Sequence, residues 1–237
     1  MATHFSPEAM KFLRGLARNN DREWFAARKH VFERELKEPM LALIGEINDA
    51  LVEFAPDHVR DPRKAMFRIY RDTRFAADKK PYKTHVAAWW VKRGMEKTSG
   101  AGFYFHVSAK ETIVAAGAYM PSPEQLLAMR RHIEKNHAAM RKILADRKLK
   151  AAMEEFEGNP LKRAPRGFAA DSPALDLIVC RQWGVSATMP PEAATSPTLV
   201  KEVVKRLRLA APLVEFLNAG LPAPAKKAGL GAEFLVD

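Results

Sequence analysis

The chain has 237 residues, is 47% hydrophobic and 28% charged, and carries a formal net charge of +11, which is typical of a basic globular protein and excludes wholesale disorder. Its longest apolar runs, residues 86–91 and 113–120, are far shorter than the roughly 18 residues of a membrane span, and the N-terminal residues carry charge where a secretory signal needs an apolar core. We therefore expect a cytoplasmic protein with no membrane partner, and the single cysteine, Cys180, excludes a disulfide within the chain.

The N-terminal residues predict helices. A Ser-Pro pair favours a helix start, because the serine hydroxyl accepts a hydrogen bond from a first-turn amide and proline has no amide hydrogen to leave unpaired. Such pairs begin at Ser6, Ser122, Ser172 and Ser196. The first pair predicts a helix over residues 6–17. A second helix should run through Trp24 and Phe32 and end or kink near Pro39, and a third should continue to about residue 54.

Between residues 66 and 120 the apolar residues follow the alternating pattern, or the short continuous runs, that are typical of strands. A polar break at residues 108–111 indicates a hairpin between two of these strands. The predicted strands cover residues 67–71, 86–91, 102–107 and 112–119.

Helical spacing returns after Ser122, where Gln125 completes a capping box and Asn136 interrupts the apolar stripe. Apolar neighbours of Cys180 indicate a buried structural thiol. The remaining patterns predict a surface helix over residues 146–157, a helix over 171–180, a strand over 182–189 and a last helix over 199–217.

Together these patterns predict an α+β fold. Its mainly antiparallel sheet should comprise about residues 66–120 and a strand near 182–189, packed with N-terminal and C-terminal helices. We expect a single domain over residues 1–217 and a tail rich in Pro, Gly, Ala and Lys over residues 218–237. No pattern in the chain predicts an oligomeric state.

Positive charge is concentrated in one segment. Residues 60–97 contain twelve Lys or Arg and four Asp or Glu, a net charge of +8, and such a local excess favours an acidic partner. Guanidinium forks and lysine ammonium groups suit the oxygens of phosphate and carboxylate groups. With the basic loop at residues 161–168, this segment predicts a site for a small phosphorylated or carboxylated ligand, formed by Arg68, Arg71, Arg74, Lys80, Lys83, Lys162, Arg163 and Arg166.

Two other interpretations of the basic segment stay open. The cations can form internal salt bridges, Arg71 with Asp78 and Arg74 with Asp72, which would make the chain a structural or partner-binding protein. Alternatively, the chain is a nucleic-acid-binding module without catalysis. That reading is favoured by aromatic residues that interleave with the cations as stacking platforms do, namely Tyr70, Phe75, Tyr82 and Trp89.

Three residues near the basic segment are candidates for acid–base catalysis: His85, His106 and Asp72. Both histidines lie on predicted strands, where a histidine is commonly a hydrogen-bonded packing residue. The spacing of His, Asp and Glu matches no metal motif, so we predict neither a metal site nor a cofactor, and we assign no catalysed reaction.

Several motifs occur in an order that resembles a known family. They are Asn19-Asn20 with Trp24-Phe25, Arg71-Asp72-Thr73-Arg74-Phe75, Asp78-Lys79-Lys80-Pro81-Tyr82-Lys83, Gly102-Phe103-Tyr104-Phe105-His106, Gly117 with Pro121, and residues 161–168. Over about residues 5–217 the chain is similar to the uncharacterised microbial family catalogued as domain of unknown function 2461. The resemblance implies no reaction, cofactor or catalytic residue.

Overall fold

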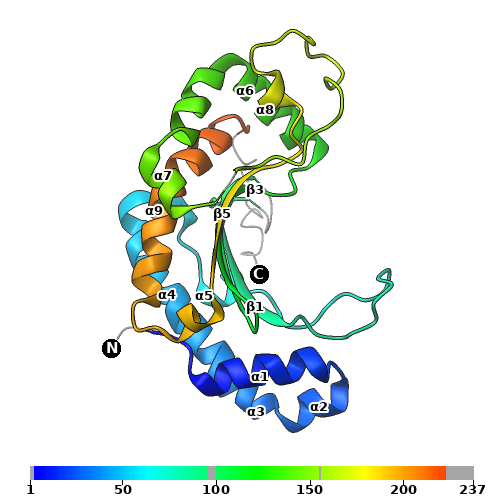
Figure 1. Ribbon diagram of the computed structural model, residues 1–237, viewed down its shortest axis with the longest axis vertical. Helices are drawn as coiled ribbons and strands as arrows, with labels where there is room; N and C mark the ends of the chain where they lie inside the picture. The colour runs from blue at the N-terminus through cyan, green and yellow to red at the C-terminus, as the bar shows by residue number, and fades with distance from the viewer. Residues whose placement is uncertain (1–2, 96–99, 155, 223–237) are drawn as a thin grey trace, which may run out of the picture.

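The computed structural model describes residues 3–95, 100–154 and 156–222. Within these ranges five strands form one antiparallel sheet in the order β1-β2-β3-β5-β4 (Figure 1). The strands are β1 (His85–Val91), β2 (Gly102–Ser108), β3 (Thr112–Ala118), β4 (Phe156–Glu157) and β5 (Trp183–Met189). Helices flank this sheet, so the predicted α+β fold with a mainly antiparallel sheet is confirmed.

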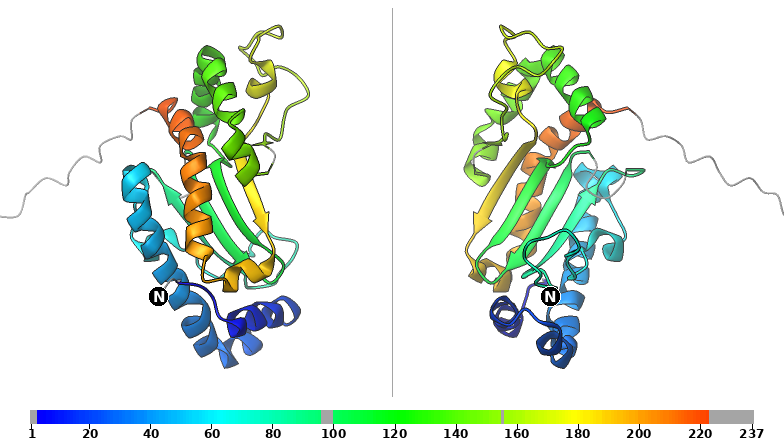
Figure 2. Two further views of the ribbon diagram at one scale, coloured as in Figure 1. Left: turned by 60° about the vertical axis from the view of Figure 1, so that its left-hand side comes forward. Right: turned by 90° about the vertical axis from the view of Figure 1, so that its right-hand side faces the viewer.

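The alternation along β2 decides which side chains enter the core. Phe103 and Phe105 are fully buried in the main hydrophobic core, whereas Tyr104 and His106 point to the opposite side of the sheet and stay partly exposed. We call the side that carries Tyr104 and His106 the open face, because the described helices leave most of it uncovered (Figure 2).

Two long helices cover the other face of the sheet: α4 (Glu38–Phe54) and α9 (Leu199–Ala219). Asn48 of α4 accepts a 3.0 Å hydrogen bond from Nε1 of Trp90 in β1, so a buried polar pair links this helix to the sheet. Both helices bury an apolar stripe at helical spacing, consisting of Leu43, Ile47 and Leu51 in α4 and of Val203, Leu207 and Val214 in α9.

The N-terminal helices lie at one end of the sheet (Figure 1). They are α1 (Pro7–Arg18), α2 (Arg22–Ala27) and α3 (Lys29–Phe32), and a π-helical turn, η1 (Glu33–Lys37), joins them to α4. Ser6 caps α1 as predicted, with its hydroxyl accepting from the amide of Ala9 at 3.1 Å. The chain does not break before Pro39. The wider π-helical turn accommodates a residue that has no amide hydrogen and would clash with the preceding turn of a regular helix.

Helix α6 (Pro123–Leu144) confirms two sequence predictions. Ser122 and Gln125 form the capping box, and Asn136 has a non-helical φ of −126° at the predicted interruption. The remaining elements are short: η2 (Pro56–His58), α5 (Pro62–Ala65), α7 (Arg147–Ala152), α8 (Leu175–Ile178) and η3 (Pro191–Thr195).

Two of the four Ser-Pro pairs do not cap a helix. Helices α8 and α9 begin three residues after Ser172 and Ser196, and neither has a side-chain cap. The Ser172 hydroxyl accepts from the amide of Ala174 at 3.3 Å, and the Ser196 hydroxyl accepts from the amide of Thr198 at 3.2 Å. These serines form local turns that compete with capping, so the predicted starts at these two positions are wrong.

Two predicted elements have other boundaries. The helix expected over residues 146–157 ends at Ala152, because the next residues pair with β5 as the edge strand β4. Residues 67–71 are not a regular strand. The chain here forms isolated bridges, one between Met66, just before the segment, and Ala88, and one between Tyr70 and Tyr82. The segment pairs with residues 81–83 instead and projects from the sheet as a long loop (Figure 1).

Cys180 is buried, with 3% of its surface exposed, and this burial raises the pKa of its thiol to about 11. The prediction of a buried thiol is therefore confirmed. In the described ranges, no helix has the combined length and apolarity required to cross a membrane. Residues 218 and 219, the first two of the predicted C-terminal tail, belong to α9. The part of the tail from residue 223 onward lies outside the described residues.

Candidate functional site

Ionisable side chains gather at one corner of the open face, where β1 begins and β2 ends. His85 is the first residue of β1, and Tyr104 and His106 lie two residues apart on β2, so the strand alternation brings all three to the same side of the sheet. Glu111 follows in the turn of the β2–β3 hairpin, and Lys83 precedes β1. We call these five residues the histidine corner.

A hydrogen bond of 3.0 Å joins the Tyr104 hydroxyl to Nδ1 of His106. Burial raises the pKa of Tyr104 to about 12, so its phenol keeps its proton at pH 7, and it donates to Nδ1 or accepts from it according to the tautomer of the imidazole. Nε2 of His106 lies 3.9 Å from Oε1 of Glu111, which is beyond hydrogen-bond distance. Tyrosine, imidazole and carboxylate therefore lie next to one another, and a hydrogen bond joins the tyrosine to the imidazole.

The two histidine rings stack, with centroids 5.0 Å apart and an interplanar angle of 27°. Burial lowers the pKa of His106 to about 4. The pKa of His85 is also lowered to about 4, first by burial and then by the nearby His106 and Lys83, while Glu111 opposes this shift. Both rings are consequently neutral at pH 7 and can each accept or donate a hydrogen bond.

Lys83 supplies a positive charge beside this neutral pair. Its ammonium group lies 4.8 Å from the ring centroid of Phe67, and that ring is 6.4 Å from the ring of Tyr104. Burial lowers the pKa of Lys83, and the charge of Arg68 adds to the effect. Among the described residues, no carboxylate lies within ion-pair distance of Lys83 or Arg68. Neither cation therefore forms a salt bridge, although Arg68 is close enough to Asp72 to lower the pKa of that carboxyl.

Two of the predicted anion-binding arginines are engaged with aspartates. Arg71 donates to Asp78 at 2.9 Å and to the carbonyl of Lys80 at 3.2 Å. Arg74 forms a two-bond pair with Asp72, from Nε at 3.0 Å and from Nη2 at 2.7 Å. These are the internal salt bridges that the sequence allowed, and Asp72 is committed to Arg74 rather than to the histidines.

The bonds of these pairs also shift the titration of the aspartates. The side-chain bond from Arg74 lowers the pKa of Asp72, and the backbone amide of Lys80 and the side chain of Arg71 lower the pKa of Asp78. Both carboxylates therefore stay charged at pH 7 and oppose the binding of a second anion in this loop.

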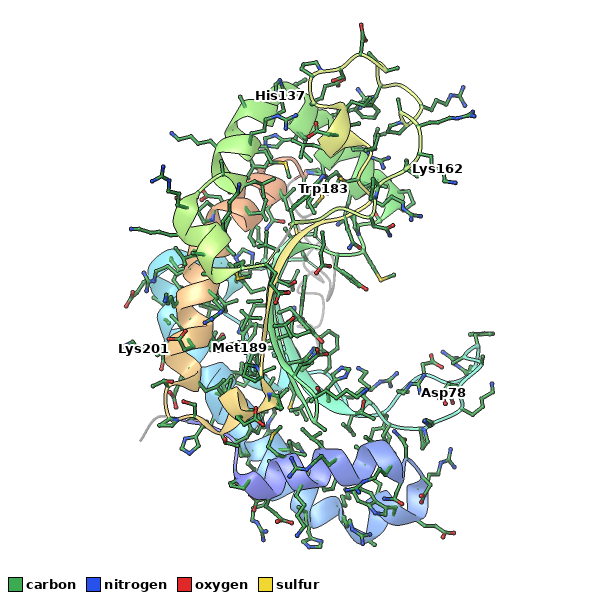
Figure 3. The ribbon with its side chains drawn as sticks, in the orientation of Figure 1. Asp78, His137, Lys162, Trp183, Met189 and Lys201 are labelled. Atoms are coloured by element: carbon green, nitrogen blue, oxygen red, sulfur yellow. The ribbon has the colours of Figure 1, made fainter. Side chains whose placement is uncertain are left out.

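The second basic segment does not meet the first. Lys162, Arg163 and Arg166 are exposed on the loop between β4 and α8. Figure 3 places Lys162 at one end of the molecule and Asp78, in the loop that carries Arg71 and Arg74, near the other. The eight predicted cations therefore do not converge; of the first segment, Lys83 belongs to the histidine corner and Arg68 lies near Lys83.

The predicted site omits Tyr104, which bonds directly to His106. Its signal was present in the sequence, because two residues that are two positions apart on a strand share a face. In the described part of the chain, no group of three or more His, Cys, Asp or Glu side chains is arranged to hold a metal ion.

Comparison with known proteins gives one match. A family model described as "Conserved hypothetical protein (DUF2461)" matches residues 8–216. No curated protein and no solved structure gives a significant match.

Proposed function

Because the chain belongs to this family of conserved hypothetical proteins, whose description names no activity, we propose a function from its own geometry: recognition of a small phosphorylated or carboxylated molecule at the histidine corner. One observation carries the proposal. Lys83 and Arg68 form no salt bridge in the described structure, and Lys83 adjoins the neutral imidazole of His85, which stacks on His106.

The corner supplies both charge and directional donors. A partly buried ammonium group has lost part of its hydration, so a bound anion restores favourable interactions that water no longer provides. The neutral imidazole of His85 offers a directed hydrogen bond to an oxyanion, while the carboxylate of Glu111, near His106, opposes the charge of the anion. The ring of Phe67 beside Lys83 lowers the local dielectric constant, which strengthens the attraction between that lysine and an anion.

Calorimetric titration with inorganic phosphate and with citrate tests this proposal. We expect binding by the unaltered protein and at least a tenfold loss of affinity for Lys83→Ala. Lys79→Ala is the matched control, because Lys79 belongs to the same loop but donates to the backbone carbonyl of Thr73 at 3.0 Å. Equal affinities of the two variants, or a larger loss for Lys79→Ala, would refute a site at the histidine corner.

Single-stranded nucleic acid is a second candidate ligand class, and the projecting loop favours it. Phe75 is 96% exposed, and the guanidinium of Arg74 lies 5.9 Å from its ring centroid. An exposed aromatic ring among cations is a stacking platform for a base. Phe75→Ala should then weaken binding of an oligothymidine strand and leave phosphate binding unchanged. Affinity for the strand should also fall steeply with salt, by about 0.7 in log K per log unit of salt for each neutralised phosphate.

A further inference from the structure

A second basic surface lies on the helical side of the molecule, away from the open face. Helices α7 and α9 run side by side there, and Lys201 marks this side in Figure 3. Between the two helices is a groove with a volume of about 620 Å³, within the range of pockets that hold small ligands. The groove has an apolar floor, formed by Ala151, Ala152, Val204 and Leu209, and its other lining residues are all cationic: Lys148, Lys201, Lys205, Arg206 and Arg208.

Only part of this positive charge is neutralised within the chain. Arg206 pairs with Glu202 at 2.7 Å, and Arg208 pairs with Glu53. The bond from Arg206 is the main cause that lowers the pKa of Glu202, so this carboxylate is already occupied. Within the described ranges, Lys148, Lys201 and Lys205 have no carboxylate at ion-pair distance. Three lysines without a salt bridge therefore surround an apolar floor, and Lys201 and Lys205 act on Glu202 only at longer range.

Three cations of α9 form a row along one side of the groove. Lys201, Lys205 and Arg208 are separated by four and three residues, so they lie on one side of the helix. At 1.5 Å per residue they extend over about 10 Å, roughly two helical turns. The phosphates of a nucleic acid could pair with these charges, but a phosphate backbone has no apolar surface to pack on the floor of the groove.

We propose that the α7–α9 groove binds an acidic amphipathic helix of a partner protein. The apolar stripe of that helix would lie on Val204 and Leu209, and its flanking glutamates or aspartates would pair with the lysines. This is the helix-in-groove mode of recognition, in which apolar anchors supply affinity and charges at the rim select the partner. The surface is separate from the histidine corner, and its occupation does not depend on an anion there.

The probe for this proposal is a capped fluorescent peptide of 18 residues, with leucines at helical i, i+3, i+4 and i+7 spacing and glutamates at the flanking positions. A scrambled peptide of the same composition has the same charge but no apolar stripe. The test variant is Lys148→Glu/Lys201→Glu/Lys205→Glu. The matched control is Lys29→Glu/Lys110→Glu/Lys135→Glu, which makes the same change in net charge at exposed positions outside the groove.

We expect fluorescence anisotropy to show binding of the amphipathic peptide, at least tenfold weaker binding of the scrambled peptide, and at least a tenfold loss of affinity for the groove variant but not for the control. An equal loss in both variants would mean that net charge alone attracts the peptide and would overturn the proposal. The absence of binding at millimolar peptide would also overturn the proposal. The same holds if the affinity for an oligothymidine strand depends on the three groove lysines while the affinity for the peptide does not.

Discussion

The hydroxyl of Tyr104 shares a 3.0 Å hydrogen bond with Nδ1 of His106, whose Nε2 lies 3.9 Å from Oε1 of Glu111. The bond joins two residues on the same strand, so the backbone of β2 holds the donor and the acceptor in place. The ring of His85, which belongs to β1, stacks on the ring of His106. The chemistry of the corner therefore depends on a tyrosine that the sequence prediction did not include.

Removal of the Tyr104 hydroxyl should change the tautomer populations of the His106 imidazole. In Tyr104→Phe the Nδ1 atom loses its hydrogen-bond partner, so both neutral tautomers become populated and the two ring ¹⁵N chemical shifts move toward a common value. Heteronuclear NMR at pH 7 measures these shifts. Tyr119→Phe is the control, because that side chain is 63% exposed and has no described hydrogen bond to His106. Unchanged shifts in Tyr104→Phe would contradict the assigned bond.

Stability should fall as the pH drops from about 6.5 toward 4. The pKa values of His85 and His106 are about 4 in the folded state and about 6.5 in the unfolded chain, so the unfolded state binds more protons across this window. For one such histidine the loss reaches at most about 2 kcal/mol at pH 5. His58, whose pKa burial also lowers to about 4, adds to the same slope.

Urea unfolding at pH 7 and pH 5 measures this loss. His85→Gln/His106→Gln should have a clearly smaller difference in the free energy of unfolding between the two pH values than the unaltered protein. His30→Gln, at an exposed position on α3, should keep the full difference. A pH dependence that is the same in all three proteins would show that the stacked histidines do not titrate as described.

Anion binding at the histidine corner should be accompanied by proton uptake. An oxyanion beside His85 and His106 stabilises their charged forms and raises both pKa values, so affinity should increase between pH 7 and pH 5.5. Calorimetry in buffers of different ionisation enthalpy counts the protons taken up. His85→Gln/His106→Gln should still bind through Lys83 but take up no proton; uptake that persists in this variant would place the titrating group elsewhere.

Gly117 should be intolerant of a side chain. Its φ of +134° is a conformation that other residues rarely adopt, and an added Cβ would lie 2.1 Å from the carbonyl oxygen of Trp183 on the neighbouring strand. Gly117→Ala should lower the free energy of unfolding by about 3 kcal/mol, because the backbone of β5 cannot move without losing its pairing with β3.

The control for this substitution lies in α4. A Cβ added at Gly45 would meet no atom within 4 Å, and alanine is favoured over glycine inside a helix. Gly45→Ala should therefore raise the free energy of unfolding by roughly 0.5–1 kcal/mol. Thermal or urea unfolding measures both variants, and similar effects of the two would contradict the described β3–β5 contact.

The local elements of this fold could be predicted from short stretches of sequence. The capping box at Ser122, the interruption at Asn136 and the alternation of β2 depend on residues within a few positions of one another. The predictions failed where a local signal competed with a distant partner. Residues 146–157 contain a helical pattern, but pairing with β5 ends the helix at Ala152.

The composition of the candidate site also depends on segments that are far apart in the sequence. The order of residues alone places a basic segment before two strand histidines, and it allows both a ligand site and internal salt bridges. Only the folded chain selects aspartate partners for Arg71 and Arg74, leaves Lys83 and Arg68 beside the histidines, and holds residues 162–166 at the far end of the molecule. The physical reason is that the charge of a side chain is a property of its residue type, whereas its available partners depend on distances between segments that are far apart in the sequence.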